Sequence, residues 1–145
     1  MTQDDAIKLV EMFKELLDKK VYLPEDGKRK ELYLKSTTDK NEFIISINRR
    51  SIVDNKCTFH ARTKGKNEPL LRLDVNPSST HTNPDGEVIN GTHLHIFKEG
   101  YEIKYAIPFD SSSKNLVDHC ISFFKKFNVI EDYQIYDFTN LRLFS

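Results

Sequence analysis

The sequence predicts an α+β fold. We expect a single domain, residues 1–145, in which an antiparallel sheet of about six strands forms a meander flanked by an N-terminal and a C-terminal helix. Apolar residues recur at helical spacing near both ends of the chain, and they alternate with polar residues between these ends. Short turns separate the alternating segments. A chain of 145 residues is long enough to bury one hydrophobic core.

The first helix is predicted from its cap and its apolar spacing. Thr2 can cap the helix, and Asp5 stands near the capping-box position. Apolar residues then recur at helical spacing from Ala6 to Leu17, so we expect an amphipathic helix that reaches about Lys20.

A second helix is expected after Pro108, which ends the last strand. Asp110 or a following serine is the expected N-cap. The apolar stripe of this helix comprises Leu116, Val117, Cys120, Ile121, Phe124 and Phe127. The tail, residues 131–145, is aromatic, and we expect it to pack back on the domain.

Six segments between the two helices read as strands. Most of them alternate apolar and polar side chains with a period of two, which is typical of an antiparallel sheet with one polar face. The segments are Glu31–Lys35, Glu42–Arg49, Cys57–Thr63, Leu70–Val75, Thr92–Phe97 and Tyr101–Ile107.

Composition and charge exclude several classes of protein. The 22 basic and 22 acidic residues balance, which argues against a protein that coats nucleic acid by bulk charge. No apolar run approaches the about 20 residues that span a bilayer, and the acidic start, Met1–Asp5, is unlike a signal peptide. We therefore expect a cytoplasmic protein. Cys57 and Cys120 lack metal-ligand spacing and are expected to be buried free thiols.

Polar side chains converge on one face of the predicted sheet. Side chains two residues apart on a strand share a face, so His93 lies with His95, Arg72 with Asp74, and His60 with Arg62. In each strand the aliphatic side chains occupy the opposite face. The connection that carries His81 and Asp85 can fold over the polar face, while Asn83-Pro84-Asp85-Gly86 reads as a turn.

Metal-independent RNA cleavage is the leading hypothesis for this face. The chemistry needs a proton donor and acceptor near neutral pH and a cation for the phosphate charge. We assign His95 or His93 as general acid and base, His81 as the second proton-transfer group, and Arg72 as the phosphate-binding cation. Asp74 would orient Arg72 or a histidine. Further substrate contacts are expected from Arg62, His60, Asn83 and Phe97, and no cofactor is expected.

Other interpretations of the same residues stay open. The His93-x-His95 pair offers two imidazoles on one face, and His81, Asp74 or His60 would complete a metal site. The face also suits binding of a protein partner or a nucleic-acid strand without catalysis. A solvated histidine pair with no chemistry is the fourth interpretation. Phe97 occupies the position where a histidine-triad nucleotide hydrolase would have its third alternating histidine.

The segment from Leu70 to Phe109 resembles an uncharacterised family of small bacterial and prophage proteins. The residues that carry the resemblance are Arg72 and Asp74, His81, Asn83 to Gly86, His93, His95, Phe97, Glu99-Gly100, and Ala106 to Pro108. The resemblance implies a shared site without naming its chemistry. It also implies a mobile-element setting, in which a non-catalytic protein that binds a host or phage protein is the alternative to a nuclease.

Overall fold

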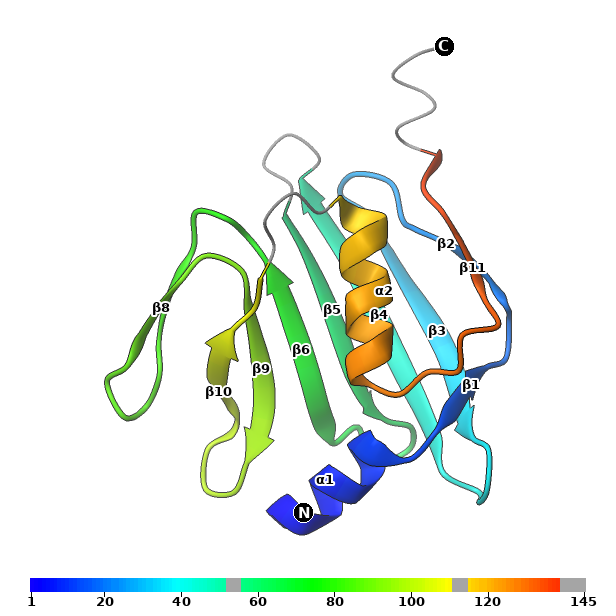
Figure 1. Ribbon diagram of the computed structural model, residues 1–145, viewed down its shortest axis with the longest axis horizontal. Helices are drawn as coiled ribbons and strands as arrows, with labels where there is room; N and C mark the ends of the chain where they lie inside the picture. Colours follow the sequence, from blue (N-terminus) through cyan, green and yellow to red (C-terminus); the bar gives the residue numbers. More distant parts are fainter. Residues whose placement is uncertain (52–55, 111–114, 139–145) are drawn as a thin grey trace.

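A seven-stranded antiparallel sheet forms the main layer of the protein (Figure 1). The computed structural model describes residues 1–51, 56–110 and 115–138. The strand order is β1-β3-β4-β5-β6-β9-β10. The strands are β1 (Lys14–Leu16), β3 (Arg29–Ser36), β4 (Glu42–Ser51), β5 (Lys56–Thr63), β6 (Pro69–Val75), β9 (His93–Lys98) and β10 (Glu102–Pro108). The six expected strands are all present with slightly different ends, and the α+β class is confirmed.

Two small sheets accompany the main sheet and were not expected from the sequence. The hairpin of β7 (Thr80–Thr82) and β8 (Val88–Asn90) is inserted between β6 and β9, and Figure 1 shows it beyond the β10 edge of the sheet. At the other side, β2 (Lys20–Tyr22) pairs in parallel with β11 (Gln134–Tyr136). These short strands lack enough alternating positions to be recognised by periodicity.

The first helix is shorter than its apolar spacing predicts. Helix α1 (Gln3–Glu11) has the expected capping box of Thr2 and Asp5, but it ends at Glu11 rather than near Lys20. Residues 14–16 instead form β1, which pairs antiparallel with β3. Phe13 and Leu17 are 63% and 58% exposed, so they are not part of a helical apolar face. Strand pairing has overridden the local helical pattern here.

Lys14 stabilises the connection between α1 and β1. Its side chain is fully buried, and its ammonium donates to the carbonyl oxygens of Val10, Met12 and Phe127 at 2.8 to 2.9 Å. The ammonium also lies 3.8 Å from the centroid of the Phe127 ring. Burial lowers the pKa of Lys14 to about 7. One side chain thus joins the end of α1 to the end of the second helix.

Helix α2 (Leu116–Lys126) covers one face of the sheet, across β4 and β5 (Figure 1). Its N-cap is Asn115 rather than Asp110, because the Asn115 side chain accepts the backbone N–H of Asp118. The serines at 111–113 lie outside the described residues. Phe123 packs against Phe59 with ring centroids 5.8 Å apart. The expected burial of Cys57 and Cys120 as free thiols is confirmed.

The tail packs back on the domain as far as it is described. In β11 it adds a strand beside β2, and Arg49 then makes two contacts with the Asp137 carboxylate at 2.9 and 3.2 Å. Residues 139–145 lie outside the described part of the chain. Within the described residues, no helix is long and apolar enough to cross a membrane.

Candidate functional site

The pairing of β6 with β9 assembles the centre of the polar face. The antiparallel register places Asp74 opposite His93 and Arg72 opposite His95. All four side chains project to the face that α2 does not cover, since the aliphatic residues between them, such as Leu73 and Leu94, are in the core. The structure thus brings together the two i, i+2 pairs that the sequence predicted to share a face.

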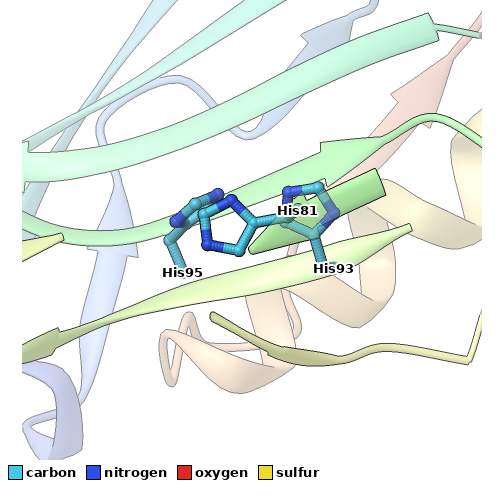
Figure 2. Close-up of side chains that lie close together, drawn as sticks. All are labelled: His81, His93 and His95. Atoms are coloured by element: carbon cyan, nitrogen blue, oxygen red, sulfur yellow. The ribbon is translucent and has the colours of Figure 1, made fainter. Parts of the chain in front are cut away.

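His81 joins this group from the β7–β8 hairpin, as Figure 2 shows. Its ring centroid lies 5.1 Å from that of His93 and 4.8 Å from that of His95. Each histidine offers a ring nitrogen within 4.8 Å of those of the other two. His93 and His95 are only 4% and 2% exposed. We call these three residues, which come from two separate elements, the histidine cluster.

Asn83 attaches the hairpin to the edge of the sheet. Its amide donates to the carbonyl oxygen of Ala106 and accepts the Ala106 N–H, both at 2.8 Å. The predicted turn at residues 83–86 is confirmed: the N–H of Gly86 donates to the carbonyl of Asn83, and Gly86 has φ of 93°. Asn83 is 2% exposed, so its side chain positions His81 and is not available to a substrate.

Hydrogen bonds to backbone carbonyls determine the tautomers of His93 and His95. The Nδ1 atom of His93 lies 2.9 Å from the carbonyl oxygen of Gly91, and that of His95 lies 2.8 Å from the carbonyl oxygen of Ile103. A carbonyl oxygen only accepts hydrogen bonds, so Nδ1 carries the hydrogen in both rings. In the neutral rings the lone pair is therefore on Nε2, which lies beside the Asp74 carboxylate in both residues.

His81 is held in the opposite tautomer. Its Nε2 atom lies 3.0 Å from Oδ1 of Asn83 and 3.1 Å from the carbonyl oxygen of Lys104. The orientation of the Asn83 amide is settled because its oxygen also accepts the Ala106 N–H. Both neighbours of Nε2 are acceptors, so Nε2 carries the hydrogen and Nδ1 keeps the lone pair.

The Asp74 carboxylate lies between the cluster and Arg72. Its Oδ2 atom is 3.4 Å from Nε2 of His93 and 3.3 Å from Nε2 of His95. Arg72 donates from Nε to Oδ1 at 3.0 Å, and its terminal nitrogen lies 3.0 Å from Nε2 of His95. Burial alone would raise the pKa of Asp74, but the contacts with the two histidines and the charge of Arg72 hold it well below its ordinary value.

The contact between His93 and Asp74 requires a positive charge. With Nδ1 of His93 bound to a carbonyl, the Nε2 of the neutral ring and the Asp74 oxygen are both acceptors and repel each other. Either a proton on Nε2 or a cation shared by both atoms removes this repulsion. The hydrogen bond with Asp74 accordingly raises the pKa of His93, against the opposing effect of its burial.

The remaining sequence-predicted residues lie apart from the cluster. Arg62 donates to Ser46 at 2.6 Å and to Glu31 at 3.2 Å, so its guanidinium is engaged on the same face. His60 stands opposite Arg72 on β5; burial lowers its pKa to about 4, and its Nε2 has no hydrogen-bond partner within the described ranges. Phe97 packs against the core and lines an apolar cavity under α1, which removes it from substrate contact at the cluster. Asp85 is exposed in its turn.

A surface cavity of about 370 Å³ gives access to the cluster. Its wall includes the histidine cluster, Arg72, Asp74 and Lys104. The carbonyls of Gly91, Ile103 and Lys104 could not be predicted from the sequence, because backbone acceptors leave no signature in residue type. Arg50 and Lys56 were not predicted either; they line a neighbouring cavity and come from the paired strands β4 and β5.

The fold and the site define an α+β protein with a histidine cluster, a carboxylate and an arginine on the open face of its sheet. The chain belongs to a family of unknown function, DUF6978, whose family model matches residues 1–129. The matched region contains both helices and every residue of the site described above. No curated protein and no solved structure matches the chain. The motif-based expectation of a bacterial or prophage origin stays a prediction.

Proposed function

We propose that the protein binds a first-row transition metal ion, with Zn²⁺ as the best match, through His81, His93 and His95. The observation that carries this proposal is the fixed tautomer of each ring. Each histidine gives its N–H to a backbone carbonyl and keeps a lone pair on the other nitrogen. Metal-ligating histidines are held in this way in most metalloproteins, because the hydrogen bond orients the ring and increases its basicity. Imidazole ligands suit zinc, copper, nickel and iron.

Asp74 supports the same proposal. A shared cation at the cluster would relieve the repulsion between the Asp74 oxygen and the histidine lone pairs. Asp74 is thus the candidate fourth ligand, or the group that would accept a hydrogen bond from a water molecule at the site. Arg72 holds Asp74 at 3.0 Å and orients it. The cavity over the cluster leaves room for such a water.

Hydrolysis is the chemistry that this arrangement serves best. A zinc ion with three histidine ligands lowers the pKa of a bound water to near 7 and so supplies a hydroxide at neutral pH. In this chain the Asp74 carboxylate would accept a hydrogen bond from the water and orient it, and Arg72 would offset negative charge on a substrate. The leading hypothesis from the sequence was a catalytic site without a metal. We propose a metal-dependent site in its place.

Metal-independent RNA cleavage is the second candidate, and one observation favours it. The contact with Asp74 favours a protonated His93, which is a general acid, while Nε2 of His95 carries the lone pair that a base needs. Arg72 would then stabilise the charge on the phosphate of the RNA. The same residues serve both candidates, so the two differ in whether activity survives removal of metal.

Zinc titration of the chelator-treated protein tests the first candidate. We expect one Zn²⁺ per chain by competition with a chromophoric chelator and by elemental analysis. His93→Gln and His95→Gln should each weaken the affinity by more than about 100-fold. His60→Gln is the matched control, since it removes a histidine from the same sheet face without touching the cluster. Lack of stoichiometric zinc in the folded wild type would contradict the proposal.

RNA cleavage separates the two candidates. The wild type is assayed in EDTA and with added Zn²⁺, beside the His93→Ala/His95→Ala double variant, whose folding is checked by circular dichroism. Cleavage in EDTA that is lost in the folded double variant would support the metal-independent candidate. Activity that appears only with zinc would support the metal-dependent one.

A further inference from the structure

A second cavity, of about 360 Å³, adjoins the histidine cluster. It shares Arg72, Asp74 and His93 with the cavity described above. The remainder of its wall comes from the ends of β4 and β5 and from the β6–β7 connection. A molecule bound here would therefore contact the residues of the proposed metal centre directly. Cavities of about this volume fit nucleotide-sized ligands.

The wall of this second cavity is positively charged. Arg50, Lys56 and Arg72 line it, and Asp74 is the only acidic residue in the described wall. Asp74 is already paired with Arg72 and with His93. Arg50 is exposed at the end of β4 and has no ion pair within the described residues. The excess of positive over negative side chains in this wall favours an anionic ligand, although the whole chain has zero net charge.

Cys57 also lines this cavity, but it does not provide a nucleophile. Its thiol is 2% exposed, and burial raises its pKa to about 12. A thiol of such high pKa carries almost no thiolate at neutral pH. The chemistry of the cavity is thus set by its arginines and by the adjoining cluster.

Metal binding and anion binding would be coupled through Arg72. In the metal-free arrangement one terminal nitrogen of Arg72 donates to the lone pair of His95. A metal ion that takes this lone pair removes the acceptor and releases one N–H of that terminal nitrogen, while Arg72 stays bound to Asp74. Arg72 lines the second cavity, so the next available acceptor is a ligand there. The planar guanidinium matches the oxygens of a phosphate group in geometry.

We propose that the second cavity binds the phosphate group of a small phosphate monoester, which is the substrate of the metal centre. This inference rests on the proposed function, because the phosphate would lie beside the metal-held water. In the hydrolysis that follows, the water oxygen forms a bond to phosphorus and the bond from phosphorus to the ester oxygen breaks. The alcohol leaves with one of the two protons of the water.

Calorimetric titration with uridine 5′-monophosphate tests this inference, with uridine as the probe that lacks phosphate. Zinc content is measured first on every sample, so that each protein is known to be loaded. We expect the zinc-loaded wild type to bind the monophosphate and not uridine. EDTA treatment should weaken binding by about 10-fold, because Arg72 returns to His95.

Arg50→Gln should weaken binding of the monophosphate by about 10-fold or more while zinc content stays at the wild-type value. Arg50→Lys should recover part of the loss. Lys40→Gln is the matched control, because it removes one exposed cation far from the cavity along the sheet and should leave the affinity unchanged.

The outcomes separate the two proposals. Zinc-loaded wild type that fails to bind the monophosphate, or Arg50→Gln that binds as well as Lys40→Gln, overturns the phosphate site and leaves the metal site standing. A wild type that takes up no zinc overturns the proposed function, and this inference falls with it. Equal binding of uridine and its monophosphate would also overturn the phosphate site.

Discussion

Asn83 and Ala106 form a pair in which a side-chain amide imitates a neighbouring strand. The Asn83 amide donates to the Ala106 carbonyl and accepts the Ala106 N–H, each at 2.8 Å. This pairing satisfies the backbone N–H and carbonyl of Ala106 at the outer edge of β10 and fixes the hairpin that carries His81. The same Asn83 oxygen determines which nitrogen of His81 carries the hydrogen. One buried residue therefore controls both the position and the tautomer of a proposed metal ligand.

Asn83→Ala is expected to weaken zinc binding although it removes no ligand. Loss of the Asn83 amide frees the hairpin from Ala106 and leaves Nε2 of His81 with the Lys104 carbonyl alone, which should lower the affinity for zinc by about 10- to 100-fold. The free energy of unfolding should fall by about 2 kcal/mol, because the polar backbone of Ala106 loses its partner. Zinc competition and urea unfolding measure the two effects. Zinc affinity equal to that of the wild type would contradict the positioning role.

Zinc should stabilise the folded protein. A ligand that binds only the native state adds about 2.7 kcal/mol when its free concentration is 100 times Kd, which for a chain of this size raises Tm by roughly 8 °C. Thermal unfolding by circular dichroism, with zinc and with EDTA, tests this. His95→Gln should unfold at the same temperature in both conditions. An equal rise of Tm in His95→Gln would assign the effect to another site.

Lys14→Met is expected to destabilise the fold. The substitution keeps much of the side-chain volume but leaves the carbonyls of Met12 and Phe127 without their donor, while the Val10 carbonyl keeps its bond from the Asn128 amide. We expect a loss of about 2 kcal/mol in the free energy of unfolding, since buried carbonyls without partners are costly. Urea unfolding measures this loss, and Lys20→Met, at an exposed position of β2, is the control. A Lys14→Met protein as stable as Lys20→Met would show that the three bonds contribute nothing net.

His60 should make the protein less stable as the pH falls below 6.5. Burial lowers the pKa of His60 to about 4 in the folded state, whereas the unfolded chain keeps the ordinary value of 6.5. Between these values the unfolded state takes up a proton that the folded state does not, so the free energy of unfolding decreases as the pH falls. Half-burial limits the effect to about 1 kcal/mol between pH 6.5 and 5.

His60→Gln removes this contribution. The difference in free energy of unfolding between variant and wild type should therefore change across pH 5 to 6.5 and stay constant above pH 7. Urea unfolding at several pH values measures the difference. Parallel pH profiles of the two proteins would show that His60 titrates normally in the folded state.

The helix at the N-terminus shows where a local pattern misleads. Apolar residues at 13, 16 and 17 fit the spacing of a helix, yet the residues around them form β1. Leu16 is buried as a strand residue opposite Leu34, while Phe13 and Leu17 are exposed. The pairing of β1 with β3 is a long-range interaction, so no short window of sequence contains it.

The sequence by itself determined which side chains of a strand share a face of the sheet. Period-two alternation put His93 with His95 and Arg72 with Asp74, because the direction of each side chain follows from the backbone of its own strand. Only the tertiary structure decided that β6 lies next to β9 in the register that sets Asp74 against His93. It also decided that Asn83 fastens a hairpin to β10 and brings His81 into the cluster. Those relations depend on hydrogen bonds between segments far apart in the chain, and these bonds form only when the sheet is assembled.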